Sequence, residues 1–97
     1  MDTAGNEISL IEVIASKEED ISLKIENESE RKALLELIEK LNEREKLVLQ
    51  LRYGLTSNER MTQWEIAEAM KISRSYVSRI EKKALQKLME EIRRDLR

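Results

Sequence analysis

The strongest periodic pattern in this sequence lies within residues 62–88. Thr62 and Glu65 have the spacing of a capping box, in which each side chain accepts a hydrogen bond from the backbone N–H of the other residue. Such a pair marks the first turn of a helix. We therefore predict a short helix over residues 62–70.

A turn and a second helix follow this short helix. Lys71 and Ile72 form the predicted turn, and Ser73 carries a hydroxyl that can accept from an unpaired N–H at the start of the next helix. A long run without Gly or Pro comes after Ser73, as expected for an uninterrupted helix. The pattern thus predicts a second helix over residues 74–95.

The second helix has two chemically different faces. At about 100° per residue, its apolar stripe consists of Val77, Ile80, Ala84 and Leu88. The opposite stripe consists of Ser75, Ser78, Arg79 and Lys82. Short hydroxyl side chains can approach base edges closely while neighbouring cations pair with phosphates. This polar stripe is therefore a candidate surface for nucleic acid.

The apolar spacing of a helix-turn-helix is met at four positions, which are Ala67, Ile72, Val77 and Ile80. An ordinary pair of amphipathic helices with a solvated basic face would show the same period. Charge favours DNA, because residues 71–87 contain six basic residues and one acidic residue, Glu81, a balance of +5 in a chain of net charge −2. We predict a helix-turn-helix whose second helix fits the DNA major groove.

Charge also divides the chain into two halves. Residues 1–45 carry thirteen acidic and six basic residues, a net charge of −7, whereas residues 46–97 carry twelve basic and seven acidic residues, a net charge of +5. DNA responds to the local basic surface more than to the total, so the overall acidity does not argue against nucleic-acid binding. The two halves are expected to have different partners.

Two further helices are predicted before the helix-turn-helix. Apolar residues at i, i+3, i+4 and i+7 indicate a helix over 29–41; they are Leu34, Leu37, Ile38 and Leu41. Asn42 and Glu45 mark the start of a helix over 43–53, which ends near Gly54, where a positive φ carries no penalty. The inward positions predicted for this helix are Leu47, Val48 and Leu51.

The fold class that follows is all-α, a four-helix domain that contains a helix-turn-helix and is preceded by an extended acidic linker. Ninety-seven residues with 40% apolar content, no Pro, no Phe and two Gly fit one small helical domain with almost no β-structure. Residues 1–28 hold a few apolar residues among acidic ones without a sustained period, so we expect them to be extended, or disordered until a partner binds. They are either a solubilising tail or, through Ile8 to Ile14, a docking surface.

The residue types argue against an enzyme. The chain has no Cys and no His, which removes disulfides, thiolate metal sites and the commonest general base and metal ligand. Its carboxylates lie on helical faces predicted to be solvated, and we expect no catalytic residue, cofactor or metal. The sequence shows neither an apolar run that could span a bilayer nor a signal peptide, so no membrane partner and a cytoplasmic location are expected.

Two motifs together resemble region 4 of bacterial sigma factors, particularly those of the sporulation type. They are LNEREKLVLQLRYGL and, after a polar connector, MTQWEIAEAMKISRSYVSRIEKKALQKL. The earlier segment GNEISLIEVI is similar to the linker, region 3.2, that precedes region 4 in that family. The resemblance covers nearly the whole chain, and it implies a linker over 1–28, a region 4 domain over 29–97 and the C-terminal part of a longer sigma factor.

The resemblance implies a function and a set of partners. It implies recognition of the minus-35 promoter element in the major groove, in a sigma factor that directs RNA polymerase to initiate transcription. Residues 29–55 would contact the β flap of the polymerase core, residues 1–28 would enter its channel, and an anti-sigma factor is a candidate inhibitor. Carried over by position, the DNA-binding residues are Arg74, Ser75, Ser78, Arg79, Lys82 and Lys83.

Two residues depart from the usual family pattern. Lys71 occupies a position where many relatives have glycine, because the turn favours a positive φ. Lysine at this position should lower the stability of the domain by up to about 1 kcal/mol. Trp64 is unusual near DNA; we favour a half-exposed tryptophan that fills a surface gap over one that faces phosphates or a protein partner.

Two other functions remain open at this stage. A free-standing helix-turn-helix regulator would bind DNA as a dimer, and the Leu85 to Leu96 stripe is the only candidate for its self-complementary surface. A helical adaptor that binds proteins alone would show no salt-dependent affinity for DNA.

Overall fold

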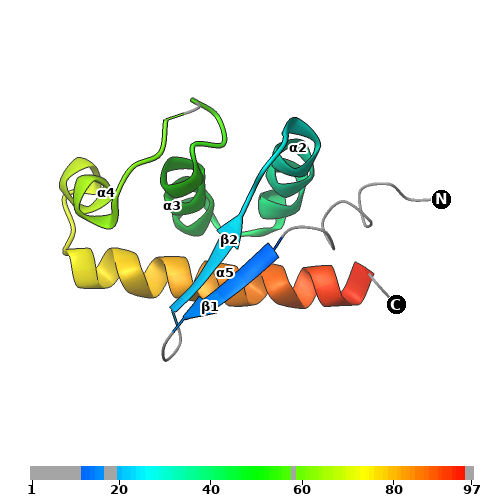
Figure 1. Ribbon diagram of the computed structural model, residues 1–97. Helices are drawn as coiled ribbons and strands as arrows, with labels where there is room; N and C mark the ends of the chain where they lie inside the picture. The colour runs from blue at the N-terminus through cyan, green and yellow to red at the C-terminus, as the bar shows by residue number, and fades with distance from the viewer. Residues whose placement is uncertain (1–11, 17–19, 58, 96–97) are drawn as a thin grey trace.

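The computed structural model describes residues 12–16, 20–57 and 59–95, with side chains for residues 23–57 and 59–94. In chain order the elements are β1 (Glu12–Ser16), β2 (Asp20–Lys24), α2 (Glu28–Leu37), the 3-10 helix η1 (Ile38–Lys40), α3 (Glu43–Tyr53), α4 (Gln63–Met70) and α5 (Arg74–Asp95) (Figure 1). The predicted all-α domain of four helices is confirmed, although the first helix ends in a 3-10 turn. Within the described ranges, no helix is long and apolar enough to cross a membrane.

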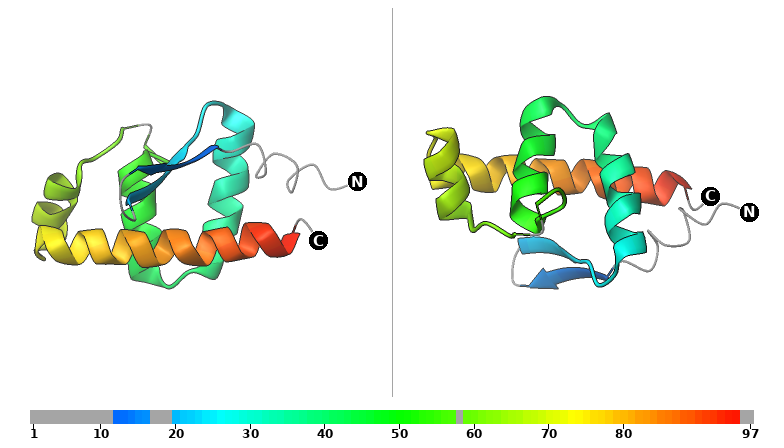
Figure 2. Two further views of the ribbon diagram at one scale, coloured as in Figure 1. Left: turned by 60° about the horizontal axis from the view of Figure 1, so that its bottom comes forward. Right: turned by 90° about the horizontal axis from the view of Figure 1, so that it is seen from above.

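The long helix α5 organises the molecule. In Figures 1 and 2, α4, α3 and α2 lie one after another along α5, with α4 at its N-terminal end and α2 nearer its C-terminal end. α5 contacts both α3 and α4, and α2 contributes to the core that surrounds its C-terminal half. The first turns of α5 therefore project beside α4, while its later turns anchor the rest of the domain.

Local capping explains where the middle helix begins and ends. Asn42 Oδ1 accepts from the Glu45 N–H at 2.8 Å, and Glu45 Oε1 accepts from the Asn42 N–H at 3.4 Å. Gly54 ends α3 in the left-handed region with φ 59°, as predicted. A Cβ there would meet the backbone of Glu59 at 3.0 Å, so both the backbone conformation and the space favour glycine.

Two apolar clusters form the core. The larger joins β2, α2, α3 and the second half of α5, and its fully buried side chains include Leu34, Ile38, Leu49, Leu85 and Leu88. The smaller joins the helix-turn-helix to α3 and consists of Val48, Ile66, Ala67, Val77 and Ile80, with Leu51, Met61, Met70 and Ile72 packed against it. The second cluster sets how α5 is presented beside α4.

One predicted core position in α3 is wrong. Leu47 is 40% exposed, whereas Leu49 is fully buried in the larger cluster. The buried face of α3 runs through Glu45, Val48, Leu49 and Tyr53. Val48 is fully buried as predicted and Leu51 packs against the smaller cluster, so the error concerns Leu47 alone.

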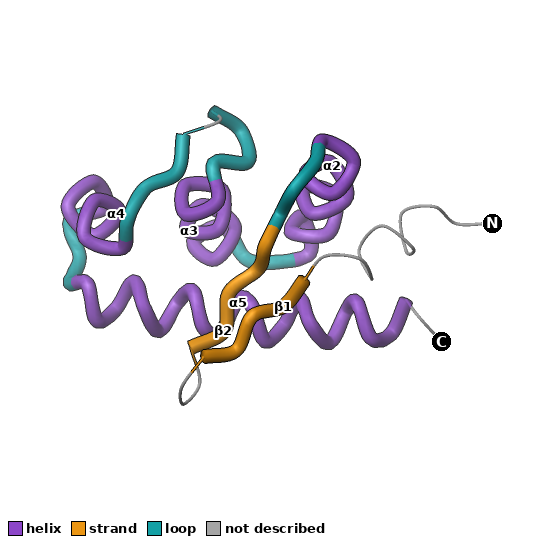
Figure 3. Tube along the Cα trace, viewed as in Figure 1, coloured by secondary structure: helices purple, strands orange, loops and turns teal. Residues whose placement is uncertain are grey.

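The N-terminal segment contains β-structure that the sequence analysis did not predict. β1 and β2 pair antiparallel, with Val13 opposite Leu23 and Ala15 opposite Ile21 (Figure 3). The expectation of almost no β-structure is therefore wrong for this hairpin, whose two extended strands lie within the residues 1–28 that were expected to be extended or disordered. Ile21, Leu23 and Ile25 alternate with polar residues, which is the period of a strand, but the run is too short to stand out.

The second strand of the hairpin packs onto the helical domain. Leu23 is only 5% exposed and belongs to the larger core cluster, and β2 contacts α5. The backbone N–H of Leu23 donates to the Tyr53 hydroxyl at 3.1 Å. The part of the linker nearest α2 is thus held by the domain, whereas Ile8, Leu10 and Ile11 of the predicted docking surface lie outside the described residues.

Candidate nucleic-acid interface

The first helix of the helix-turn-helix starts with the predicted capping box. The Glu65 N–H donates to Thr62 Oγ1 at 3.1 Å, and the Thr62 N–H donates to Glu65 Oε1 at 2.8 Å. These reciprocal bonds satisfy two backbone donors that would otherwise be unpaired at the helix start. α4 therefore begins at a fixed residue, Gln63.

The turn between the two helices is a Schellman motif centred on Lys71. The Ile72 N–H donates to the Ala67 carbonyl at 3.0 Å, and the Lys71 N–H donates to the Glu68 carbonyl at 3.3 Å. Lys71 adopts φ 61°, and it is the one non-glycine with a positive φ among the described residues. The predicted positive φ at this turn is confirmed, and lysine here should cost up to about 1 kcal/mol of stability relative to glycine.

The second helix starts and packs as the sequence predicts. Ser73 Oγ accepts from the Tyr76 N–H at 3.1 Å, the bond expected of an N-cap. All four members of the predicted apolar stripe are buried, namely Val77, Ile80, Ala84 and Leu88. Since this stripe faces the core, the opposite side of α5 must face outward.

The six predicted DNA-binding residues all lie in the first half of α5. Ser75, Arg79 and Lys83 are exposed. Arg74, Ser78 and Lys82 are half-buried. The structure thus brings the six residues together on one helix segment, with hydroxyl and basic side chains interleaved. On the α4 side, the acidic residues Glu65 and Glu68 line the groove beside Ser75.

Arg74 is held by two residues of α4. Its Nη1 donates to Gln63 Oε1 at 2.8 Å, and its guanidinium carbon lies 5.5 Å from the centre of the Trp64 ring. Trp64 is 71% exposed. The interpretation of this tryptophan as a half-exposed filler of a surface gap is therefore wrong, because its exposed ring instead stacks near the guanidinium of a candidate DNA contact.

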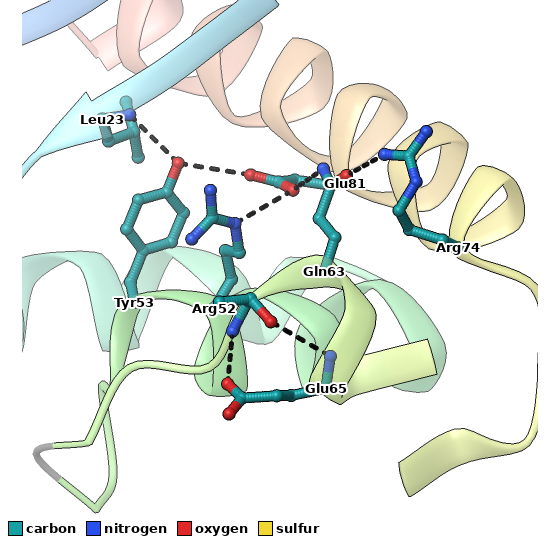
Figure 4. Close-up of polar contacts among 8 residues, drawn as sticks. Leu23, Arg52, Tyr53, Gln63, Glu65, Arg74 and Glu81 are labelled. Carbon is teal, nitrogen blue, oxygen red and sulfur yellow. Dashed lines mark hydrogen bonds and ion pairs between the residues drawn. The ribbon is translucent and has the colours of Figure 1, made fainter. Parts of the chain in front are cut away.

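A buried carboxylate lies behind this arginine, and the sequence analysis did not assign it a role. Glu81 is 5% exposed, and its Oε1 accepts from Gln63 Nε2 at 2.7 Å (Figure 4). Its Oε2 accepts from the Tyr53 hydroxyl at 3.5 Å. Arg52 Nε lies 3.4 Å from Oε1 but makes no hydrogen bond within the described part of the chain.

Tyr53 connects this cluster to the hairpin. Its hydroxyl accepts from the Leu23 N–H at 3.1 Å and donates toward Glu81. Burial raises the pKa of the Tyr53 phenol to about 12; the Leu23 N–H opposes this shift, and the negative charge of Glu81 adds to it. The phenol therefore stays protonated and can donate throughout the physiological range.

A second ion pair fixes α5 against α3. Glu45 is 4% exposed, and its two carboxylate oxygens accept from Lys87 Nζ at 2.9 Å and 3.1 Å. The same carboxylate caps α3 through Asn42. One basic residue of the 71–87 segment, Lys87, thus pairs with a carboxylate of α3.

A known protein family matches the part of the chain that contains the helix-turn-helix. The family model "Sigma-70, region 4" matches residues 37–90, which include α3, α4 and most of α5. The chain belongs to the sigma-70 region 4 family. The match includes the whole helix-turn-helix and all six candidate DNA-binding residues of this region 4 chain.

Named sigma factors are similar over nearly the whole chain. The RNA polymerase sigma-28 factor of Bacillus thuringiensis subsp. kurstaki is 50% identical over 90 residues, which are 93% of this chain and 38% of that protein. The sigma-K factor of Bacillus subtilis (strain 168) is 47% identical over 93 residues, 96% of this chain and 32% of that protein. The sigma-E factor of Clostridium acetobutylicum is 40% identical over 96 residues, 99% of this chain and 41% of that protein.

These relatives are longer than the region they share with this chain. The chain spans between about a third and two fifths of their length. No solved structure matches this chain.

Proposed function

We propose that this chain recognises the minus-35 element of promoters, as the C-terminal part of a sporulation-type sigma factor that directs RNA polymerase to initiate transcription. The observation that carries the proposal is the two-sided character of α5. Its apolar stripe is buried, while hydroxyl and basic side chains share its outward side. A helix held in this way can enter a major groove without losing its packing.

The roles of individual residues follow from their positions. Ser75, Ser78 and Arg79 lie along the outward side of α5, where they would approach base edges and nearby phosphates. Lys82 and Lys83 lie about one turn further along, where they would pair with phosphates. Arg74, at the first position of α5, would contact the base edge or backbone at the start of the element.

The remaining surfaces are assigned to RNA polymerase. Residues 1–28 would form the linker, and residues 29–97 would form the region 4 domain. Within that domain, residues 29–55 would contact the β flap of the core enzyme, while the linker would run toward the channel of the enzyme. The buried Leu23 ties the end of this linker to the domain, so part of it would follow the movements of region 4. An anti-sigma factor is a further candidate partner, and the complex would act in the cytoplasm without catalysis by this chain.

The dimeric regulator is less well supported. Its only candidate surface, the Leu85 to Leu96 stripe, has Leu85 and Leu88 at 0% exposure within a single chain, and Leu96 lies outside the described residues. The basic and hydroxyl surface of α5 likewise favours DNA over a purely protein-binding adaptor.

Core RNA polymerase provides the direct test. Holoenzyme that contains this chain should bind a labelled duplex with a matched minus-35 element more tightly than a duplex in which that element is scrambled. The affinity for both duplexes should fall with rising salt, because phosphate contacts release counterions. Equal affinity for the two duplexes would contradict promoter recognition, and failure to associate with the core enzyme would contradict the proposed role in directing RNA polymerase.

A further inference from the structure

The starting point is a buried acceptor with defined donors. The Glu81 carboxylate is 5% exposed and lies where α5 passes α3 and α4. Gln63 Nε2 donates to it at 2.7 Å and the Tyr53 hydroxyl donates to it at 3.5 Å. The Arg52 guanidinium pairs with its charge, with Nε 3.4 Å from Oε1. A buried carboxylate without hydrogen-bond donors would strongly destabilise the folded state, so the fold must keep these contacts.

The carboxylate determines which way the Gln63 amide points. A carboxylate can only accept hydrogen bonds and a guanidinium can only donate them, whereas an amide has one end of each kind. Gln63 must therefore turn its NH₂ toward Glu81 and its oxygen toward Arg74. Rotating the amide by 180° would place oxygen against oxygen on one side and N–H against N–H on the other.

Arg74 receives a defined position from this arrangement. Its Nη1 donates to Gln63 Oε1 at 2.8 Å, while the Trp64 ring lies 5.5 Å from its guanidinium carbon. A guanidinium has five N–H donors, and the Gln63 bond engages a single nitrogen. The side chain is thus oriented before DNA arrives, which avoids part of the entropy cost of ordering it on binding.

We propose that Gln63 and Glu81 are positioning residues that pre-order Arg74 for contact with the promoter element. Neither residue needs to touch DNA itself, since Gln63 acts through Arg74 and Glu81 acts through Gln63. The proposal rests on the proposed function, and it adds two residues of the fold to the determinants of promoter affinity.

A double-mutant cycle tests whether Gln63 acts through Arg74. The four holoenzymes carry the unchanged chain, Gln63→Ala, Arg74→Ala and both changes, and fluorescence anisotropy gives their affinity for the matched duplex. Gln63→Ala should weaken binding by about 2- to 10-fold, the range for loss of one positioning hydrogen bond. In the Arg74→Ala background the same change should have almost no effect. Gln86→Ala, an exposed glutamine on α5, is the matched control and should leave the affinity unchanged.

The outcomes separate the inference from the proposed function. If Gln63→Ala has no effect, or has the same effect in both backgrounds, Gln63 does not act through Arg74 and the inference is wrong. If Arg74→Ala leaves affinity unchanged while the unchanged holoenzyme still prefers the matched duplex, the inference is also wrong but promoter recognition stands. If the unchanged holoenzyme shows no preference, the proposed function itself is wrong.

Glu81→Gln tests the second step. An amide at position 81 can donate as well as accept, so it no longer fixes the orientation of the Gln63 amide. The Arg74 side-chain Nε–H resonance of this variant should show increased motion by NMR relaxation, with lower affinity for the matched duplex. Unchanged Arg74 motion in a folded Glu81→Gln protein would overturn the role of Glu81; if that variant does not fold, the Gln63 cycle still decides whether Arg74 is positioned from α4.

Discussion

Leu23 in the hairpin donates its backbone N–H to the hydroxyl of Tyr53 at the end of α3, across 3.1 Å and thirty residues of sequence. The same hydroxyl donates to Glu81 on α5. One buried phenol therefore joins the end of the linker, the middle helix and the candidate DNA-recognition helix. This contact explains why β2 is part of the domain rather than a detached tether.

Replacing Tyr53 with Phe should loosen the hairpin. The change removes the acceptor of a buried N–H, which costs about 1 to 3 kcal/mol of unfolding free energy. Hydrogen exchange of the Leu23 amide should accelerate by about fivefold or more, since 1 kcal/mol corresponds to roughly that factor. Tyr76→Phe is the matched control, because Tyr76 is 40% exposed. Equal exchange of the Leu23 amide in both variants would show that the Tyr53 bond does not hold β2.

Stability should fall at alkaline pH through the same phenol. The folded-state pKa of about 12 lies above the ordinary value of 10.0, so the folded chain keeps a proton that the unfolded chain loses. The stabilisation is fully present below pH 10 and is lost as pH rises through about 12, at a slope of about 1.4 kcal/mol per pH unit. A phenolate absorbance titration of the Tyr76→Phe variant isolates Tyr53; a midpoint near pH 10 in the folded protein would contradict its burial.

Ile80 should be essential for the helix-turn-helix core. It is 7% exposed in the smaller cluster with Ile66 and Val77, so Ile80→Ala should cost about 2 to 5 kcal/mol, much of the stability of a domain this small. Leu47→Ala, at a 40% exposed leucine, should cost well under half as much. Thermal unfolding followed by circular dichroism compares the two, and similar melting temperatures would mean that the packing of α5 against α4 is wrong.

Glycine should stabilise the turn at position 71. Lys71 has φ 61°, where glycine avoids the steric cost of a Cβ, so Lys71→Gly should raise the unfolding free energy by up to about 1 kcal/mol. Lys83→Gly inside α5 should instead lower it by about 1 kcal/mol. Urea unfolding measures both variants. A loss of stability in Lys71→Gly would show that the turn does not adopt the left-handed conformation.

Elements with local signals could be predicted from the sequence, and long-range contacts could not. The capping pairs Thr62 with Glu65 and Asn42 with Glu45 lie three residues apart, and both form as expected. The contact between Leu23 and Tyr53 depends on the folded arrangement of segments thirty residues apart. The alternating pattern around β2 is visible in the sequence. A two-stranded hairpin is only marginally stable by itself, however, and this one is stabilised by packing against the helices.

The candidate interface divides in the same way. The helical period placed Ser75 and Arg79 outside and Val77 inside, because periodicity alone determines the faces of a helix. Glu81 was counted only as the lone acid of a basic segment, although its position next to Ile80 at the edge of the apolar stripe was a signal of burial. Its donors come from α3 and α4, which no local pattern in α5 could indicate.

We expect α5 to recognise a specific base sequence rather than duplex DNA in general. Arg79 is exposed at the centre of the outward stripe, where its guanidinium can donate to both O6 and N7 of a guanine. Lys82 lies about one turn further along, where the helix should leave the groove and a lysine suits phosphate better than bases. The two residues should therefore respond differently to the DNA sequence.

The most direct measurement compares Arg79→Ala and Lys82→Ala in holoenzyme on matched and scrambled minus-35 elements across a range of salt concentrations. Arg79→Ala should reduce the binding free energy by about 1 to 3 kcal/mol on the matched element and should change it little on the scrambled one. Lys82→Ala should weaken binding to both and reduce the salt dependence by about one ion. If Arg79→Ala instead weakens binding equally on the two elements, Arg79 contacts phosphate and the assignment of base recognition to α5 at this residue is wrong.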